Sequence, residues 1–210
     1  MTRRLIIDPR TPEPERLQEA ADLLRAGEVL AYPTDTLYGL AADPRNPAAV
    51  RRLFDLKGRA ADTAVPVIAC DLEQVESHAG RLTDLDRRLA GRFWPGPLSL
   101  VLEAWPSLAP GVAAADGTVA VRVPDHAIAR ALARLAGHPL TATSANRTGE
   151  KPAATADEAI AALGGGVAMV VDGGPTTGGA PSTIVRVRAG RVVLVREGAI
   201  AWARVLELPR

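Results

Sequence analysis

The chain has 210 residues, of which 47% are hydrophobic and only one, Cys70, is a cysteine. This length and composition can bury the core of one large domain, or at most of two small ones, and a single cysteine excludes an internal disulfide framework and a four-cysteine zinc site. The 25 lysines and arginines nearly balance the 24 aspartates and glutamates, giving a formal net charge of +1 that argues against a dedicated nucleic-acid binder and requires any anion site to be local.

The N-terminal stretch MTRRLIIDPR has too few consecutive apolar residues for a signal-peptide core or a membrane span. A single cysteine is also compatible with a reducing compartment. We therefore expect a cytoplasmic protein that does not contact a membrane.

Apolar runs of strand length alternate with segments of helical period along the chain, and this alternation favours an α/β domain. A helix is expected from Pro14 to a stop at Gly27, because Leu17 and Leu24 recur with helical spacing between them. The remaining elements expected in the first half are strands at 5–8 and 28–33, a helix at 47–58, a strand at 64–70, and helices at 71–79 and 83–93.

The second half continues the same pattern after WPGP, residues 94–97, where two prolines flanking a glycine must end the preceding helix. The expected elements are strands at 98–105 and 118–124, a helix at 125–137, a strand at 139–145, a helix at 156–163, a strand at 167–174 and a hairpin at 182–198 that turns at Ala189 and Gly190. We expect one mixed, twisted sheet with helices on its faces.

Ligands of open α/β sheets bind outside the strand ends, so the polar insertions after strands are the candidate sites. The first is PTDTLYGL, residues 33–40. Pro33 and Gly39 can shape a turn there, and Thr34 or Asp35 can cap a helix. Taken alone, this structural interpretation is favoured over a functional one.

The second candidate is KGRAAD, residues 57–62, at the end of a predicted helix. Lys57 and Arg59 can complement the negative end of that helix, with Gly58 as its stop. They can equally clamp phosphates, and the spacing does not choose between the two roles.

The third candidate is Arg122 in the apolar strand TVAVRVP. Strand alternation places Thr118, Ala120 and Arg122 on the face opposite the valines. Arg122 is a surface arginine if that face meets water, and a carboxylate receptor if the face lines a cavity. The fourth candidate, TATSAN at 141–146, is either an ordinary turn or a place where small residues let a ligand approach the main chain.

Several standard motifs are missing or lack their context. The chain has no GxxxxGK[ST] phosphate loop and no GxSxG nucleophile elbow, and GGPTTGG at 173–179 leads into a predicted strand instead of the helix that a dinucleotide site needs. His78, His126 and His138 have no closely spaced ligand partners and are expected to be surface or packing residues.

The ordered set PTDTLYGL, KGR, FWPGPLSLVL, VAVRVPDH, TSAN, PSTIVRV and REGAI resembles the YrdC-type L-threonylcarbamoyladenylate synthases, from about residue 14 to residue 200. The resemblance implies a single-domain twisted mixed sheet with helices on its faces around a deep, positively lined cavity. It also implies a nucleotidyltransferase that makes threonylcarbamoyl-AMP and pyrophosphate from L-threonine, bicarbonate and ATP, for the t6A37 modification of tRNA. Its partner would be a downstream tRNA threonylcarbamoyl transferase.

By this resemblance, threonine would be held by Thr36, Arg122, Ser182 and the backbone of Ala142. The residues expected to hold ATP are Arg59, Thr118, Ser144 and Arg196, and those expected to stabilise the charge of the triphosphate are Lys57 and Arg59. Mg²⁺ is expected with the nucleotide, on phosphate oxygens and water, without a dedicated set of protein ligands. Because no covalent intermediate is required, cations and hydroxyls suffice for catalysis by positioning and charge stabilisation.

The chain departs from the family pattern at three places. Thr63 and Ile68 stand where some members have an asparagine and a histidine that contact the substrates, and the loop at 147–153 is one residue longer than usual. We expect the short form of the family, a single domain over 1–210 without a further C-terminal domain, in which another loop would have to close the site.

Two alternatives stay open. One is a non-catalytic module that binds double-stranded RNA through a one-sided basic patch, for which weak RNA binding would be expected. The other is a related carbamoyl-transfer protein of hydrogenase maturation, whose acylphosphatase-like unit and cysteine-rich zinc fingers are not found in this sequence.

Overall fold

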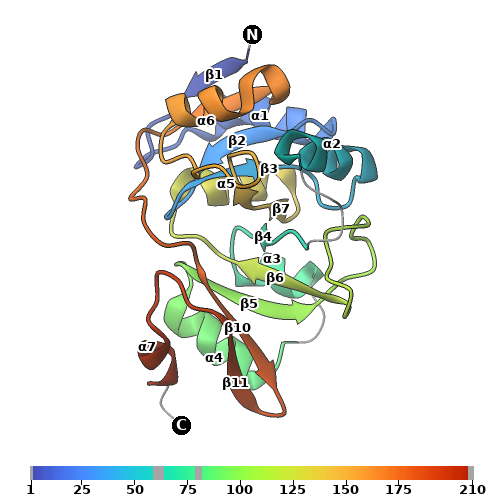
Figure 1. Ribbon diagram of the computed structural model, residues 1–210, viewed down its shortest axis with the longest axis vertical. Coiled ribbons are helices and arrows are strands. Elements are labelled where there is room, and N and C mark those ends of the chain that lie inside the picture. The colour runs from blue at the N-terminus through green and yellow to red at the C-terminus, as the bar shows by residue number, and fades with distance from the viewer. Residues whose placement is uncertain (1, 59–63, 79–81, 208–210) are drawn as a thin grey trace.

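The computed structural model describes residues 2–58, 64–78 and 82–207, which form two mixed β-sheets with helices packed on them (Figure 1). The strands of the first sheet, in spatial order, are β1 (Arg3–Ile6), β9 (Met169–Asp172), β2 (Leu30–Pro33), β3 (Tyr38–Ala41) and β8 (Thr143–Ser144). Those of the second sheet are β11 (Arg191–Arg196), β10 (Thr183–Arg188), β5 (Leu98–Glu103), β6 (Thr118–Arg122), β4 (Val67–Ile68) and β7 (Leu140–Thr141). The α/β class is confirmed, but the expectation of one sheet is wrong.

The two sheets arise because the chain changes sheet at Ala142, inside the segment for which one strand was predicted. Thr141 pairs with Val67 in the second sheet, whereas Ser144 pairs with Gly39 in the first. The Thr141 hydroxyl holds the crossing by donating to the Leu40 carbonyl at 2.9 Å and accepting from the Ala42 N–H at 2.8 Å. Short strands of this kind carry no periodicity of their own, so the sequence pattern cannot show the crossing.

The helices lie close to their predicted ranges. They are α1 (Pro14–Arg25), α2 (Pro47–Lys57), α3 (Leu72–His78), α4 (Asp84–Phe93), α5 (Ala127–Ala136), α6 (Ala156–Leu163) and α7 (Trp202–Leu206), with a 3₁₀ turn, η1, at Gly164–Gly166. The turn and α7, which spans five residues, were not predicted. None of the helices within the described residues is both long and apolar enough to cross a membrane.

Local chemistry explains where α2 begins and ends. The Asn46 side chain accepts from the N–H groups of Ala48 at 2.9 Å and Ala49 at 3.3 Å, which satisfies donors that a helix start leaves without partners. At the other end, Gly58 adopts the left-handed conformation with φ of 58° and stops the helix. The helix therefore delivers Lys57 to a fixed place at its C-terminus.

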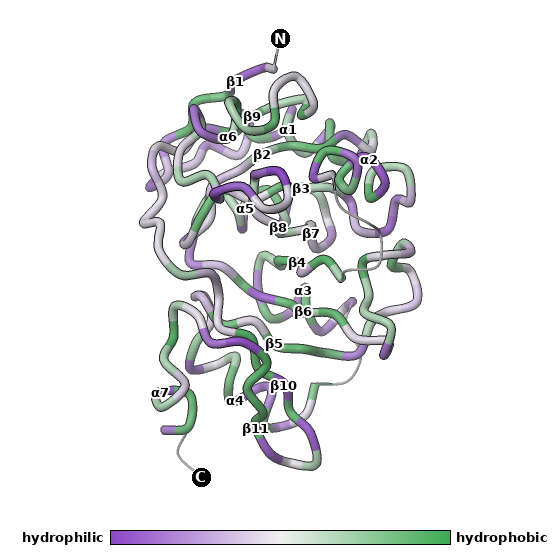
Figure 2. The backbone as a smooth tube through the Cα atoms, in the orientation of Figure 1, coloured by the Kyte–Doolittle hydropathy of each residue, from purple (hydrophilic) through white to green (hydrophobic). Residues whose placement is uncertain are grey.

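Helices cover both faces of the first sheet. On one face, α1 and α5 pack through Leu17 and Ile128 against Leu30 and Met169. On the other face, α2 and α6 belong to a second core cluster that also contains α3, α4 and the apolar residues of β5 and β6, which Figure 2 shows as hydrophobic strands. The opposite face of the second sheet, which carries Thr118, Ala120 and Arg122 on β6, points toward the first sheet.

Candidate functional site

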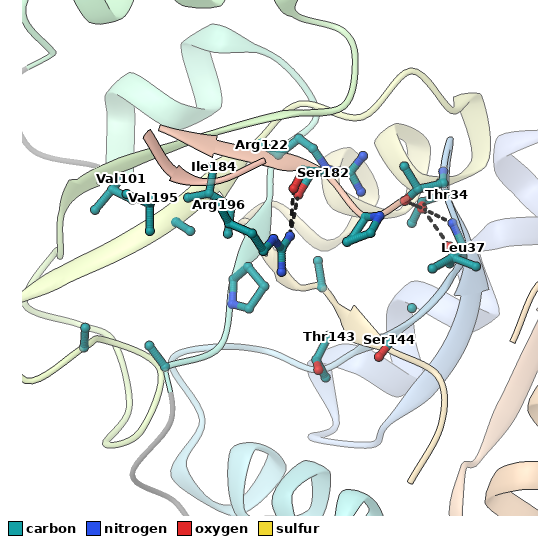
Figure 3. Close-up of a pocket in the computed structure, with 18 of the residues that line it drawn as sticks. Thr34, Leu37, Val101, Arg122, Thr143, Ser144, Ser182, Ile184, Val195 and Arg196 are labelled. Carbon is teal, nitrogen blue, oxygen red and sulfur yellow. Dashed lines mark hydrogen bonds between the residues drawn. The ribbon is translucent and has the colours of Figure 1, made fainter. Parts of the chain in front are cut away.

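A cavity of about 570 Å³ lies between the two sheets and is called the intersheet cavity below (Figure 3). The first sheet and its loops contribute mainly hydroxyls and small residues, among them Thr34, Thr36, Gly39, Thr143 and Ser144. The second sheet and its loops contribute Val101, Thr118, Ala120, Arg122, Ser182, Ile184, Arg186 and Arg196. The mixture of apolar, hydroxyl and guanidinium groups suits a ligand with both charged and apolar parts.

Most of the residues assigned by resemblance meet in this cavity. Its lining contains all four residues assigned to threonine, Thr36, Arg122, Ala142 and Ser182, and three of those assigned to ATP, Thr118, Ser144 and Arg196. Arg59 and Thr63 lie outside the described residues. Ile68 is fully buried in β4.

The predicted alternation along β6 is confirmed. Thr118, Ala120 and Arg122 line the intersheet cavity, whereas Val119 and Val121 are buried in the core on the opposite face. Arg122 is therefore on a cavity wall, as its interpretation as a carboxylate receptor requires.

Arg122 has an ionic partner that sequence reasoning did not find. Its Nη1 atom lies 2.5 Å from Oδ1 of Asp35, and the two side chains are only 8% and 10% exposed. The second carboxylate oxygen of Asp35, Oδ2, is buried and has no hydrogen-bond partner among the described residues. The only sequence signal was an acidic residue directly before Thr36 in the PTDT motif, because the pairing joins residues 87 positions apart.

Thr34 builds the loop that presents Thr36. Its hydroxyl accepts from the Thr36 N–H at 3.2 Å and the Leu37 N–H at 3.3 Å, and donates to the Leu37 carbonyl at 2.7 Å. The Thr36 hydroxyl lies 3.1 Å from it and lines the cavity. The structural and the functional interpretations of this motif therefore apply to different residues, Thr34 and Thr36.

The segments PST and REGAI form one local unit beside the cavity. The Thr183 hydroxyl accepts from the N–H groups of Gly198 at 2.9 Å and Ile200 at 3.0 Å, and donates to the Ile200 carbonyl at 2.6 Å. A Cβ atom on Gly198 would lie 2.1 Å from the carbonyl oxygen of Pro181, so only glycine fits there. This packing fixes Ser182, the residue between Pro181 and Thr183.

Ser182 is in turn held by Arg196 and Ser99. Arg196 Nη2 donates to the Ser182 carbonyl at 2.8 Å, as Figure 3 shows, and the Ser182 hydroxyl lies 3.0 Å from the Ser99 hydroxyl. Burial, and then the positive charge of Arg122, lower the pKa of Arg196 from its ordinary value. Both guanidinium groups line the same cavity, where they offer hydrogen-bond donors to carboxylate or phosphate oxygens.

Lys57 has a role that neither sequence interpretation included. Its side chain is buried, and Nζ donates to the carbonyl oxygens of Ser144 at 2.7 Å and Asn146 at 2.9 Å. Lys57 is not part of the cavity lining found among the described residues. Through these hydrogen bonds, Lys57 holds the backbone at the end of β8, which carries Ser144.

Acidic residues offset part of the positive charge of the cavity. Arg186 pairs with Asp116 at 2.6 Å, and the Thr118 hydroxyl donates to the same carboxylate at 2.6 Å. Arg122 is paired with Asp35, whereas Arg196 has only neutral hydrogen-bond partners, the carbonyl and hydroxyl of Ser182, among the described residues. The deep, positively lined cavity implied by the resemblance stays a prediction.

The described residues contain no group of three or more His, Cys, Asp or Glu side chains that could hold a metal ion. Of the histidines, His138 is buried with Nδ1 2.9 Å from the Pro139 carbonyl oxygen, and the His78 ring packs on Trp105 in a T-shaped arrangement with ring centroids 6.1 Å apart. These contacts are those of packing residues.

Comparisons with known proteins place this geometry in a family. A family model for Sua5, YciO and YrdC proteins, described as telomere recombination, matches residues 22–198. A threonylcarbamoyl-AMP synthase of Bacillus subtilis is 42% identical over 95% of this chain and 58% of its own length, and one of Thiobacillus denitrificans is 42% identical over 81% of this chain and 90% of its own. The crystal structure of Pyrococcus abyssi Sua5 complexed with L-threonine is 33% identical, with a TM-score of 0.91 over 100% of this chain and 62% of that one. The chain thus spans less than two thirds of the length of the Bacillus and Pyrococcus proteins.

Proposed function

Because the chain belongs to the Sua5/YciO/YrdC family, we propose that it forms threonylcarbamoyl-AMP and pyrophosphate from L-threonine, bicarbonate and ATP. The observation that carries the proposal is the intersheet cavity, in which Thr36, Arg122, Ala142 and Ser182 come together from separate segments of the chain. The names of the relatives and the threonine complex of the Pyrococcus protein support it. The reaction is a nucleotidyl transfer, since the AMP part of ATP moves to a carbamate oxygen.

The threonine end of the site is proposed around Arg122. One arm of its guanidinium is held by Asp35, and the planar fork has further donors for the carboxylate of an amino acid. The Ala142 N–H donates to the Pro66 carbonyl at 2.8 Å, so the Ala142 carbonyl is the backbone group that would accept from the amine. The hydroxyls of Thr36 and Ser182 would complete the contacts.

The ATP end is proposed around Arg196, Ser144 and Thr118, with Arg59 as a further phosphate ligand. Lys57 would act on this end through the backbone it anchors at Ser144, in addition to the charge stabilisation expected for it. Mg²⁺ would enter with ATP and neutralise phosphate charge. The one lining carboxylate among the described residues, Asp116, already accepts from Thr118 and Arg186, so phosphate oxygens and water fit as the main metal ligands.

These groups match the demands of the reaction. The threonine amine must be neutral to form the carbamate, and a carbamate oxygen must then reach the α-phosphate of ATP. Fixing both substrates between two sheets replaces a bimolecular encounter by a local one, and guanidinium groups stabilise the charge that develops on phosphate. The product is labile, so a tRNA threonylcarbamoyl transferase in the cytoplasm is the proposed next enzyme.

Pyrophosphate release tests the proposal directly. We expect the protein with Mg²⁺ and ATP to release pyrophosphate only when both threonine and bicarbonate are present. Arg122→Ala should lower the rate at least tenfold, because a charge-assisted contact to substrate is lost. Arg191→Ala, at an exposed residue of the hairpin outside the described lining, is the matched control and should keep the rate.

Two results would overturn the proposal. One is pyrophosphate release that does not depend on threonine. The other is the absence of ATP turnover together with a salt-sensitive, sequence-independent affinity for double-stranded RNA, which would favour an RNA-binding module.

A further inference from the structure

Two arginines of the intersheet cavity differ in how their charge is compensated. Arg122 is paired with the Asp35 carboxylate at 2.5 Å. Arg196 donates to the carbonyl and hydroxyl oxygens of Ser182, which are neutral, and no ion pair of Arg196 is found among the described residues. Counting the described side chains alone, the Arg122 end of the cavity is therefore nearly neutral in net charge, and the Arg196 end is positive.

Loop construction does not explain the Asp35 side chain. Thr34 supplies the hydrogen bonds that shape residues 34–37, and Thr177 donates to the backbone carbonyl of Asp35, a contact that needs no carboxylate. Of the two carboxylate oxygens, Oδ1 contacts Arg122, and Oδ2 is buried with no partner in the part of the chain that the structure describes. Burying a carboxylate with one oxygen unsatisfied costs free energy. The presence of an acidic side chain beside Arg122 therefore requires an explanation.

The charge of the proposed substrates supplies one. A threonine zwitterion carries no net charge, whereas a triphosphate or pyrophosphate is a polyanion. An uncompensated Arg122 would attract polyphosphate as strongly as Arg196 does, because both guanidinium groups line the same cavity. A neutral Arg122–Asp35 pair still offers donors to a carboxylate but gives a polyanion little net attraction.

We propose that Asp35 is a positioning and specificity-determining residue that separates the two subsites by charge, keeping polyphosphate at Arg196 and leaving Arg122 to the amino acid. The proposal rests on the proposed function, since it assigns the two ends to threonine and to phosphate. Asp35 acts through Arg122 and need not touch either ligand.

Asp35→Asn tests the proposal, because the amide retains an oxygen that can accept from Arg122 but removes the negative charge. Calorimetry measures the binding of inorganic pyrophosphate and of L-threonine to the full chain, each alone and in the presence of the other. In the unsubstituted protein, pyrophosphate should leave threonine affinity unchanged. In Asp35→Asn, pyrophosphate should bind about tenfold more tightly, as expected for one uncompensated charge, and should now compete with threonine.

The matched control is Asp43→Asn, which removes another nearly buried carboxylate that is paired with an arginine, Arg45, but is not in the described cavity lining. It should leave the binding of both ligands as it is. If Asp35 had only a structural role, Asp35→Asn would weaken the binding of both ligands and would create no competition between them.

The outcomes separate this inference from the proposed function. If the unsubstituted protein binds threonine and Asp35→Asn shows neither tighter pyrophosphate binding nor competition, the inference is wrong and the function stands. If the unsubstituted protein does not bind threonine, the proposed function fails, and the pyrophosphate affinities alone decide on the charge compensation. Tighter pyrophosphate binding by Asp35→Asn than by the unsubstituted protein supports it, and an unchanged affinity overturns it.

Discussion

Replacing Lys57 by methionine should destabilise the protein even though no ligand is present. Lys57 is only 4% exposed, and its Nζ atom donates to two backbone carbonyls, those of Ser144 at 2.7 Å and Asn146 at 2.9 Å. Leaving two buried carbonyls without donors costs about 1–3 kcal/mol each, while removing a buried ammonium recovers part of its desolvation cost. We expect Lys57→Met to lower the free energy of unfolding by about 2–4 kcal/mol.

Urea unfolding followed by circular dichroism measures this change. Lys151→Met is the matched control, because Lys151 is 84% exposed and lies 3.6 Å from Glu158, and it should change stability by less than about 0.5 kcal/mol. If Lys57→Met were as stable as the unsubstituted protein but released no pyrophosphate, the structural role would be refuted and Lys57 would act on the triphosphate.

Three further predictions concern other parts of the molecule. Gly198→Ala should lower the free energy of unfolding by more than about 2 kcal/mol, because its Cβ would lie 2.1 Å from the carbonyl oxygen of Pro181. The control Gly91→Ala, in the open interior of α4, should leave stability unchanged or raise it by up to about 1 kcal/mol. Equal melting temperatures of the two variants would contradict this prediction. Thr36→Val should keep the melting temperature and weaken threonine binding, whereas Thr34→Val should lower the melting temperature because the loop loses its hydrogen bonds; the reverse pattern would exchange their roles. Burial lowers the pKa of His138, so below about pH 6.5 the unfolded chain binds more protons than the folded one. The free energy of unfolding should therefore fall, as the pH is lowered, by up to about 1.4 kcal/mol per pH unit. His138→Gln should reduce this slope, and equal slopes in the two proteins would disprove the role of His138.

The sequence predicts an element well where its pattern is long and its ends are marked. Leu17 and Leu24 recur on one face of α1, and Pro14 marks its start, so both the helix and its buried face are confirmed. The turn of the terminal hairpin at Ala189 and Gly190 is confirmed as well, with both residues at positive φ. These features depend on neighbours in the sequence.

Features that depend on distant partners were not predictable in this way. The crossing between sheets at Ala142 is set by pairing with β4 and β3, which the local pattern does not encode. The strand β3, Tyr38–Ala41, was not predicted, because it begins within the PTDTLYGL motif, whose proline, glycine and polar residues indicated a turn.

The same distinction holds for the candidate site. Alternation alone correctly placed Arg122 on the face opposite the valines, and the structure puts that face on a cavity wall. The partners of Arg122 and Lys57 could not be found from sequence, because Asp35 and Ser144 are 87 positions away from them in each case. Both pairings decide what the site residues do.

Calorimetric titration with L-threonine, and then with a non-hydrolysable ATP analogue, tests most directly whether the intersheet cavity is the site of both substrates. We predict saturable binding of each ligand to the unsubstituted protein, loss of threonine binding with retained analogue binding in Arg122→Ala, and weakened analogue binding in Arg196→Ala. Absence of binding of both ligands to the unsubstituted protein, or unchanged binding in both variants, would contradict the assignment.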